Sequence, residues 1–257
     1  MMYVLSLNWN TTDSILRLYK SLQENSSNEF VFVIVDNGSC TQEFHHLMNF
    51  FQNKDNVFIK REEINLGFAC GNNRGIEIIK KMINNNNDDN PYLFFINSDI
   101  IINEKNWDKK VISELDKNNV GIVGCTYHPL KWDKFGKFYI QQKTEQSVES
   151  ETVQGSLFTI KYTVLEIEYE KNKTYFDENF KFAHYEETDL QLRIMKLGFK
   201  CIWLDIDHIH DHNHSATKKN NFKLSDEIQN ESDFKKNSEK NRQLLFSKHK
   251  DFFLRRG

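Results

Sequence analysis

Continuous apolar runs of strand length alternate with amphipathic segments through the first half of the chain. The apolar runs cover residues 3–7, 30–35, 92–96 and 120–125, with a short strand expected over 57–60, and the amphipathic segments cover 12–22, 42–51, 76–83 and 107–115. Strands that are apolar at every position are buried on both faces, which is typical of a parallel sheet with helices on either side. The sequence therefore predicts an α/β fold with a mostly parallel central sheet and helices on both faces.

The second half of the chain is less regular. We expect a loop or hairpin over 130–150, a strand over 154–160, a helix over 188–197, a strand over 201–209 and a basic-ended helix over about 238–253. Segments 126–153 and 161–182 carry no readable motif. We expect one domain over 1–217, with halves at about 1–125 and 126–217, followed by a helical tail over 218–257.

Composition excludes several classes of protein. The formal net charge of −3 argues against a general nucleic-acid binder, and we expect no nucleic-acid partner. No apolar run approaches the roughly 20 residues that span a bilayer, and the N-terminal stretch lacks the basic region and cleavage site of a signal peptide. None of the four cysteines is at CxxC spacing. These features predict a cytoplasmic protein with reduced cysteines.

Polar side chains follow two of the predicted strands, at the point where each strand ends. Asp36 comes directly after the run 30–35, and Asn97, Ser98 and Asp99 follow the run 92–96. Ligands of open parallel sheets bind beyond the carboxyl ends of the strands. A turn aspartate is the structural alternative for either acid. Two such acids, flanked by Asn and Ser, favour a ligand site at this edge of the sheet.

The segment 65–75, NLGFACGNNRG, is rich in Gly and Asn, and we expect it to form a loop that opens the helix over 76–83. Its glycines are four residues apart, which fits neither GxGxxG nor GxxxxGK[ST]. Backbone N–H groups of such a loop can bind phosphate, and Arg74 would add a fixed charge. A plain loop at the start of a helix is the alternative.

Two further clusters carry titratable groups. Glu186, Glu187 and Asp189 stand at the start of a predicted helix, where carboxylates are also favoured for structural reasons. Their mutual repulsion can raise one pKa and produce a general base. His208, His210, His212 and His214 alternate, as in HIHDHNH, and would share one strand face if the strand continues. Imidazole is a common metal ligand, although exposed loop histidines are the alternative.

Taken in order, these motifs resemble the family 2 glycosyltransferases, in particular the rhamnosyltransferase-like branch, over roughly residues 1–217. The resemblance is carried by VLSLNWN at 4–10, VDNGS at 35–39, NLGFACGNNRGI at 65–76, NSD at 97–99 in place of NPD, YEETDLQLR at 185–193, and His210 with Ser215. It implies a GT-A fold, in which a nucleotide-binding half is fused to an acceptor-binding half. It also implies inverting transfer of a hexosyl or deoxyhexosyl group from a nucleotide-diphosphate donor to a hydroxyl.

The resemblance also implies roles for individual residues. Glu187 would be the catalytic base, with Glu186 and Asp189 as alternatives, and Asp99 with His210 would hold Mn²⁺ or Mg²⁺. Asp36 would bind the base or ribose of a dTDP-, UDP- or GDP-linked donor. The remaining donor-binding residues would be Asn8, Asn65, Gly67, Asn72, Arg74, Asn97 and Ser98. The acceptor would be a carbohydrate or a lipid-linked sugar.

Other functions stay open at this point. One is a non-catalytic module that binds sugar nucleotides. Another is a zinc hydrolase, although HIHDH is one residue short of HxHxDH. A sugar nucleotidyltransferase would need a Gly-rich, basic loop after the first strand, where this chain has NWNTTDS. The tail could pack on the domain, form a homodimer, or lie on an anionic membrane as a peripheral contact at its inner face.

Overall fold

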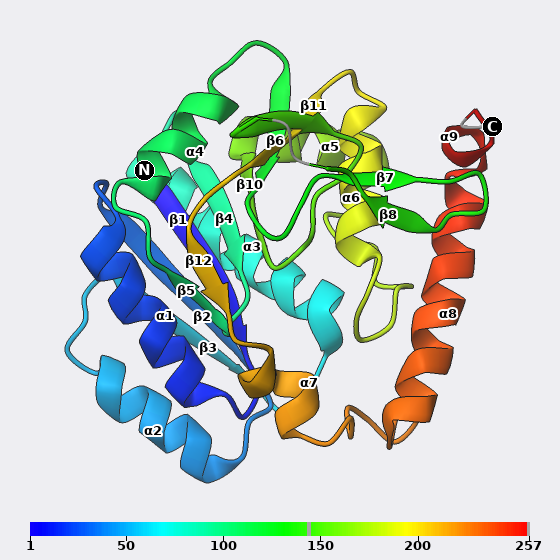
Figure 1. Cartoon of the computed structure of the whole chain (residues 1–257). Helices are drawn as coiled ribbons and strands as arrows, with labels where there is room; N and C mark the ends of the chain where they lie inside the picture. Colours follow the sequence, from blue (N-terminus) through cyan, green and yellow to red (C-terminus); the bar gives the residue numbers. More distant parts are fainter. Residues whose placement is uncertain (143–144, 256–257) are drawn as a thin grey trace.

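A computed structural model describes residues 1–142 and 145–255 of the chain (Figure 1). Among these residues, the main sheet has eight strands in the order β3-β2-β1-β4-β10-β6-β11-β9. The strands are β1 (Met2–Asn8), β2 (Phe30–Asn37), β3 (Val57–Glu62), β4 (Tyr92–Ile96), β6 (Val120–Gly124), β9 (Ser147–Ser150), β10 (Leu157–Lys161) and β11 (Lys200–Leu204). Strands β3, β2, β1 and β4 run parallel, as do β6 and β11, while β10 and β9 run antiparallel to their neighbours.

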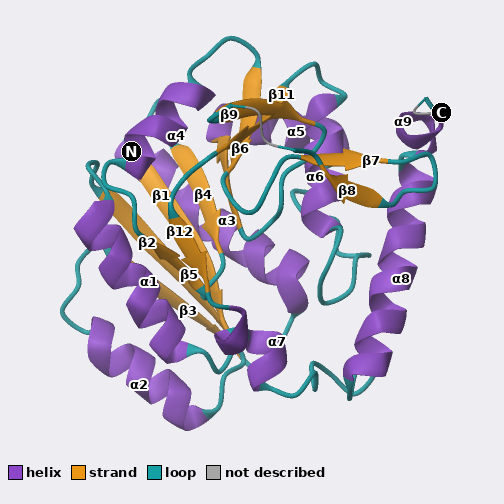
Figure 2. Ribbon diagram, in the orientation of Figure 1, coloured by secondary structure: helices purple, strands orange, loops and turns teal. Residues whose placement is uncertain are grey.

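Helices cover both faces of this sheet, as Figure 2 shows. Alternate residues of β1 point to opposite faces: Met2 and Val4 join one buried cluster, and Tyr3 and Leu5 join the other. The first face is covered by α1 (Thr12–Asn25), α2 (Thr41–Phe51) and α4 (Trp107–Leu115), and the second by α3 (Gly67–Asn86), α5 (Tyr162–Asn172) and α6 (Glu186–Met195). The predicted α/β class is confirmed, because helices lie against each face of the sheet. Strands with apolar side chains on both faces need such helices to exclude water from each side.

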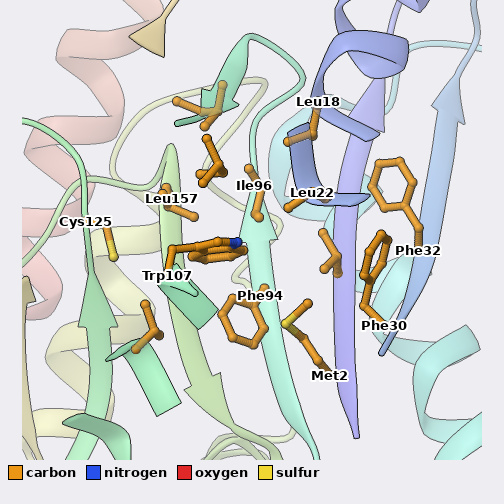
Figure 3. Packing of buried hydrophobic residues seen from close by; sticks show 14 of the residues in the cluster. Met2, Leu18, Leu22, Phe30, Phe32, Phe94, Ile96, Trp107, Cys125 and Leu157 are labelled. Carbon is orange, nitrogen blue, oxygen red and sulfur yellow. The ribbon is translucent and has the colours of Figure 1, made fainter. Parts of the chain in front are cut away.

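The first face is closed by aromatic packing (Figure 3). Trp107 is fully buried, and its ring meets Phe94 of β4 edge to face, with centroids 5.2 Å apart. The indole Nε1 of Trp107 donates a hydrogen bond of 3.0 Å to Ser26, so its polar atom is satisfied despite burial. This contact fastens α4 to the centre of the sheet.

The expected Gly-rich loop over 67–75 is wrong, because this segment is the first half of α3. A Cβ at Gly71 would lie 3.0 Å from Leu7 Cδ1, and a Cβ at Gly75 would lie 2.2 Å from Leu5 Cδ1. Glycines four residues apart share one helix face, and here that face lies directly against β1. The spacing therefore serves close packing of helix against strand.

Gly75→Val is expected to lower the free energy of unfolding by at least about 2 kcal/mol, since the added methyl groups would overlap Leu5 in a filled core. Asn84→Val on the exposed side of the same helix is the matched control and should change stability by less than about 0.5 kcal/mol. Urea unfolding of both variants measures the difference. Equal midpoints for the two variants would show that α3 does not pack as closely as described.

Several elements of the second half differ from the expected ones. The strand expected over 201–209 is split into β11 and β12 (His208–His210), and the strand expected over 154–160 is β10, which begins at Leu157. Helix α5 and strand β5 (Ile100–Ile102) were absent from the expectation. The expected hairpin is present as β7 (Leu130–Trp132) paired with β8 (Phe138–Ile140), and β12 pairs with β5.

The tail packs on the domain. The tail contains the end of α7 (Ala216–Lys219), then α8 (Glu231–Lys248) and α9 (Lys250–Leu254). A short 3₁₀ turn, η1 (His212–His214), precedes α7. Leu245 and Phe253 are fully buried in a cluster with Trp132, Phe180 and Leu192. Of the tail's three expected roles, packing is therefore observed. Within the described part of the chain, no helix is long and apolar enough to cross a bilayer.

Candidate active site

A cavity of about 570 Å³ lies where the carboxyl ends of β1, β2 and β4 meet the loops of the second half. The N-terminal half contributes Trp9, Asn37, Asn65, Gly67 and the turn of Asn97, Ser98 and Asp99. The second half contributes Tyr127, Gly155, Glu186, Glu187 and His210. The tail contributes Lys218, Phe222, Leu224 and Phe234, so the site depends on parts of the whole described chain.

Asp99 and His210 meet in the wall of this cavity. The turn after β4 carries Asp99, and β12 carries His210, whose Nε2 lies 3.4 Å from Asp99 Oδ1. Pairing of β12 with β5 holds the two together, with His210 opposite Ile100, the residue after Asp99. Among the described residues, the buried Nδ1 of His210 has no hydrogen-bond partner. A carboxylate suits Mn²⁺ or Mg²⁺, and an imidazole beside it can add a nitrogen ligand for a transition metal, with substrate oxygens completing the shell.

The two glutamates enter from the first turn of α6. Glu186 is 2% exposed, and its Oε2 has no hydrogen-bond partner in the described structure. Burial raises the pKa of Glu186 well above its usual range, and the charge of Glu187 raises it further. Burial also raises the pKa of Glu187. An adjacent pair of carboxyls in one wall can hold one proton between them, which leaves one carboxylate free to act as a base.

Gly155 makes room for Glu187. A Cβ at position 155 would lie 2.5 Å from Glu187 Cγ, so any other residue would displace the glutamate. The backbone before α6 is also unusual, because Phe182, His184 and Tyr185 all have positive φ angles. Such conformations cost energy in residues other than Gly and persist where the surroundings enforce them. Here they aim the start of α6 into the cavity.

The raised pKa of Glu186 should make the free energy of unfolding depend on pH. Unfolded Glu186 releases its proton near the ordinary value of 4.5, while the folded state keeps it, so stability falls as pH rises above that value. Glu186→Gln removes this loss. The stability difference between variant and wild type should therefore grow in the variant's favour from pH 4.5 upward, as measured by urea unfolding across that range. Parallel pH profiles would contradict the shift.

Asp189, the third predicted acid, does not line the cavity. Its Oδ2 accepts a hydrogen bond of 2.8 Å from Arg193 Nε, and its Oδ1 lies 2.8 Å from His249 Nε2 and 2.7 Å from Lys248 Nζ. Asp189 is fully buried, and these three basic partners hold its carboxylate away from the cavity. The prediction of Asp189 as an alternative base is corrected: it is a buried counterion that joins α6 to the tail.

The donor-binding residues expected from the sequence divide into two groups. Asn65, Gly67, Asn97 and Ser98 line the cavity. Asn65 Oδ1 accepts hydrogen bonds from Asn37 Nδ2 at 2.9 Å and from the Gly67 N–H at 3.0 Å. Ser98 lies 3.3 Å from the hydroxyl of Thr11. This network fixes the amide side chains of Asn37, at the carboxyl end of β2, and of Asn65, just before the first turn of α3.

The other group lies outside the cavity wall. Asp36 is fully buried, accepting hydrogen bonds from Asn8 Nδ2 at 2.8 Å and from the Ser39 N–H at 3.2 Å. Asn72 donates to Phe68 O within α3, and Arg74 is exposed on that helix. Asn8, Asp36, Asn72 and Arg74 are not among the residues that line the cavity, and their predicted contact with a donor stays a prediction. Asp36 and Asn8 brace the turn beneath the site.

The histidines do not share a strand face, because β12 ends at His210 and His212 to His214 form the 3₁₀ turn. His212 contacts the Tyr127 hydroxyl, and His214 contacts Asp211 at 2.7 Å. Among the described residues, no group of three or more His, Cys, Asp or Glu side chains could hold a metal ion. The zinc-hydrolase alternative therefore has no protein ligand set in this part of the chain.

Sequence reasoning missed the aromatic and tail residues of the cavity, namely Trp9, Tyr127, Trp132, Phe138, Lys218, Phe222 and Phe234. Trp9 lies within the first-strand motif VLSLNWN at 4–10, so its place in that motif was a usable signal. The tail residues reach the site only through packing of Leu224, Ile228 and Phe234 near Trp9 and Phe182. No local pattern reveals a contact over such a sequence separation.

An α/β sheet with carboxylates and an imidazole beyond the carboxyl ends of its strands is the arrangement expected for a GT-A fold. Residues 4–185 match the family model of glycosyl transferase family 2, which is more than half of the chain. The chain belongs to this family, and the resemblance noted from its motifs is confirmed. The rhamnosyltransferase-like branch stays a prediction.

Solved structures agree on the fold. GalNAc-T7 with UDP, GalNAc and Mn²⁺ is 13% identical with a TM-score of 0.65, and the alignment covers 97% of this chain and 56% of that one. The mannosyltransferase PcManGT from Pyrobaculum calidifontis, with GDP-Man and Mn²⁺, is 13% identical with a TM-score of 0.58, covering 79% and 54%.

TarS 1–349 from S. aureus in complex with UDP is 18% identical with a TM-score of 0.56, covering 98% of this chain and 69% of that one. This chain spans little more than half the length of the first two structures. No curated protein matches it in sequence. At these identities the likeness establishes the GT-A fold, which confirms the predicted fold class.

Proposed function

We propose that the protein is an inverting glycosyltransferase, moving a hexosyl or deoxyhexosyl group from a nucleotide diphosphate to an acceptor hydroxyl. One observation carries this proposal: the acid pair Glu186 and Glu187 lines the same cavity as the Asp99 and His210 pair. Inverting transfer needs a base on the acceptor side and charge neutralisation on the leaving diphosphate. A single cavity that offers both kinds of group is suited to that reaction.

The donor side of the proposal rests on the edge of β1, β2 and β4. Asp99 and His210 would hold Mn²⁺ or Mg²⁺, which neutralises the charge of the departing diphosphate when bound. Lys218 lies in the same wall, and no ion-pair partner for it occurs among the described residues. Its ammonium is suited to a phosphate oxygen. Asn37, Asn65 and Trp9 would bind the nucleoside of a UDP-, dTDP- or GDP-linked donor through amide hydrogen bonds and ring contact.

The acceptor side rests on α6 and its surroundings. Glu187 would take the proton of the acceptor hydroxyl, and the acceptor oxygen would bond to the anomeric carbon from the face opposite the diphosphate. The bond from that carbon to the diphosphate oxygen breaks, and the nucleoside diphosphate leaves with the electron pair. Trp132 and Phe138 line this region and suit the apolar faces of a carbohydrate or a lipid-linked sugar.

Two observations bear on the alternatives. A non-catalytic binding module would have no need of a partly buried acid pair, whose burial costs stability. The neighbours named above were crystallised with UDP, GDP-Man and Mn²⁺, which supports a nucleotide-sugar ligand of this chain.

A thermal-shift panel with UDP, dTDP, GDP and CDP, each with Mn²⁺, Mg²⁺ or EDTA, tests the proposed donor site. A ligand that binds the native state raises the melting temperature by mass action. We expect one nucleotide to raise it in the presence of a divalent metal and to lose most of that effect with EDTA. Absence of a shift with every nucleotide, together with stabilisation by Zn²⁺ alone, would contradict the proposal.

A further inference from the structure

The β7–β8 hairpin carries large apolar side chains that face solvent. Phe135 is 62% exposed, Phe138 47%, Tyr139 52% and Ile140 59%. All three residues of β8 are exposed, although a two-stranded sheet would normally turn one face inward. We call these four residues, with Lys131, Lys134 and Lys137, the hairpin patch.

The hairpin is held in a defined position. Asp133 Oδ1 accepts hydrogen bonds from the backbone N–H groups of Phe135, at 2.8 Å, and Lys137, at 2.9 Å. Arg242 of α8 donates a hydrogen bond of 2.8 Å to Phe135 O, and the Phe246 ring lies against Gly136. Figure 1 shows the hairpin reaching across to α8. The apolar side chains are therefore presented on an ordered support.

Basic residues alternate with the apolar ones. The segment 130–140, LKWDKFGKFYI, has three lysines against one aspartate, in a chain whose net charge is −3. The aspartate is Asp133, whose carboxylate accepts hydrogen bonds from backbone N–H groups of the turn. Lys131 pairs across the hairpin with Tyr139, and Lys134 Nζ lies 5.5 Å from the Phe135 ring centre. The hairpin segment thus combines apolar side chains with an excess of lysines, one of which, Lys137, also interacts with Glu239 of α8.

The mixture of aromatic and basic side chains in the hairpin patch favours some binding partners over others. In a second copy related by a two-fold axis, the lysines of the two patches would meet, and like charges in contact oppose association. Aromatic rings can pack on a sugar ring, but a free glycan would also need amide or carboxylate partners for its hydroxyls, and the seven residues of the patch include neither. Aromatic side chains with flanking lysines suit the interface of an anionic bilayer, where rings enter the headgroup layer and ammonium groups meet phosphates.

We propose that the hairpin patch docks the protein on the surface of an anionic lipid bilayer. Phe138 belongs both to the patch and to the wall of the cavity, and its ring lies 5.6 Å from that of Trp132, which also lines the cavity. Docking through the patch would bring the mouth of the cavity to the membrane surface. This goes beyond the proposed transfer reaction, and it assigns the contact to the hairpin, where the sequence had suggested the C-terminal helix.

Vesicle flotation of the full chain tests the charge contribution, with phosphatidylcholine vesicles that either contain or lack phosphatidylglycerol. We expect binding to the anionic vesicles only, weakening as salt increases. Lys134→Glu/Lys137→Glu should lower the partition coefficient at least about tenfold. Lys81→Glu/Lys109→Glu, with the same change of net charge at exposed sites on α3 and α4, is the matched control and should retain binding.

The apolar contribution is tested by Phe135→Ser/Ile140→Ser, which leaves Phe138 in the cavity wall untouched. We expect at least about tenfold weaker binding. Phe58→Ser/Ile167→Ser, whose side chains are 44% and 51% exposed on β3 and α5, is the control and should bind like wild type. Circular dichroism of each variant verifies folding.

Three results would overturn the proposal: no binding of the wild type to anionic vesicles, equal binding to neutral ones, or equal losses in the patch and control variants. A dimer in light scattering that Phe135→Ser/Ile140→Ser abolishes would also overturn it, in favour of a second copy. Nucleotide binding in the thermal-shift panel is independent of all these outcomes, so failure of the membrane proposal and failure of the proposed function are distinguishable.

Discussion

Glu187→Gln is expected to lower sugar transfer by about 10²–10⁴-fold, because glutamine cannot take the proton of the acceptor hydroxyl. The amide keeps the size of the side chain, so the space beside Gly155 stays filled and the fold is retained. Donor binding should be unchanged, since the nucleotide is proposed to bind at the edge of β1, β2 and β4. Initial rates of nucleoside diphosphate release, with binding measured by calorimetry, separate the two effects.

Two matched substitutions sharpen this result. Glu178→Gln removes an exposed carboxylate outside the cavity that accepts a hydrogen bond from Asn73, and it should leave the rate unchanged. Glu186→Gln keeps a neutral side chain that can donate a hydrogen bond, which is the form that burial favours there. Its rate should fall less than that of Glu187→Gln. If Glu186→Gln lost more activity than Glu187→Gln, the base would be Glu186.

Asp99→Asn is expected to abolish the metal-dependent part of nucleotide binding and to lower transfer by at least about 100-fold. Asparagine keeps the shape of the turn after β4 but removes the charge that would face the cation. Calorimetric titration of the nucleotide, with Mn²⁺ and with EDTA, measures the loss. We expect wild type to bind more tightly with Mn²⁺ and the variant to bind equally in both conditions.

Asp211→Asn is the control for this experiment. Asp211 lies near Asp99 in space, because its N–H donates to Asp99 O at 2.8 Å, but its carboxylate pairs with Arg17 and His214. The substitution changes the same chemical group just outside the cavity wall. An equal loss in both variants would argue against Asp99 as the metal ligand and for a general effect of negative charge.

The fold of the first half was predictable because its central strands β1, β2, β4 and β6 are buried on both faces. Residues 30–35 and 92–96 are apolar at every position, which indicates burial on both faces, and the helices between the strands have one apolar side. The exception is instructive. The segment with Gly67, Gly71 and Gly75 was expected to be a loop because Gly disfavours helices, yet the tight contact of Gly71 with Leu7 and of Gly75 with Leu5 outweighs that propensity.

The candidate site was predictable where its residues stand next to strand ends or helix starts. Asp99, Glu186, Glu187 and His210 all reach the cavity. Asp189 could not be separated from its neighbours by sequence, because its partners Lys248 and His249 come from the far end of the chain. The tail residues of the cavity were hidden for the same reason. Such contacts arise from tertiary packing and leave no local periodicity.

The most direct test of the central claim is proton NMR of a panel of UDP-, dTDP- and GDP-linked sugars incubated with the protein and Mn²⁺. Water can replace the acceptor in a slow reaction, so donor cleavage is observable without knowing the acceptor. The account predicts release of the nucleoside diphosphate from one class of donor, with the free sugar first appearing in the inverted anomeric configuration, and loss of this activity in Glu187→Gln. A first product with retained configuration, or cleavage that is unchanged in both Glu187→Gln and Asp99→Asn, would contradict it.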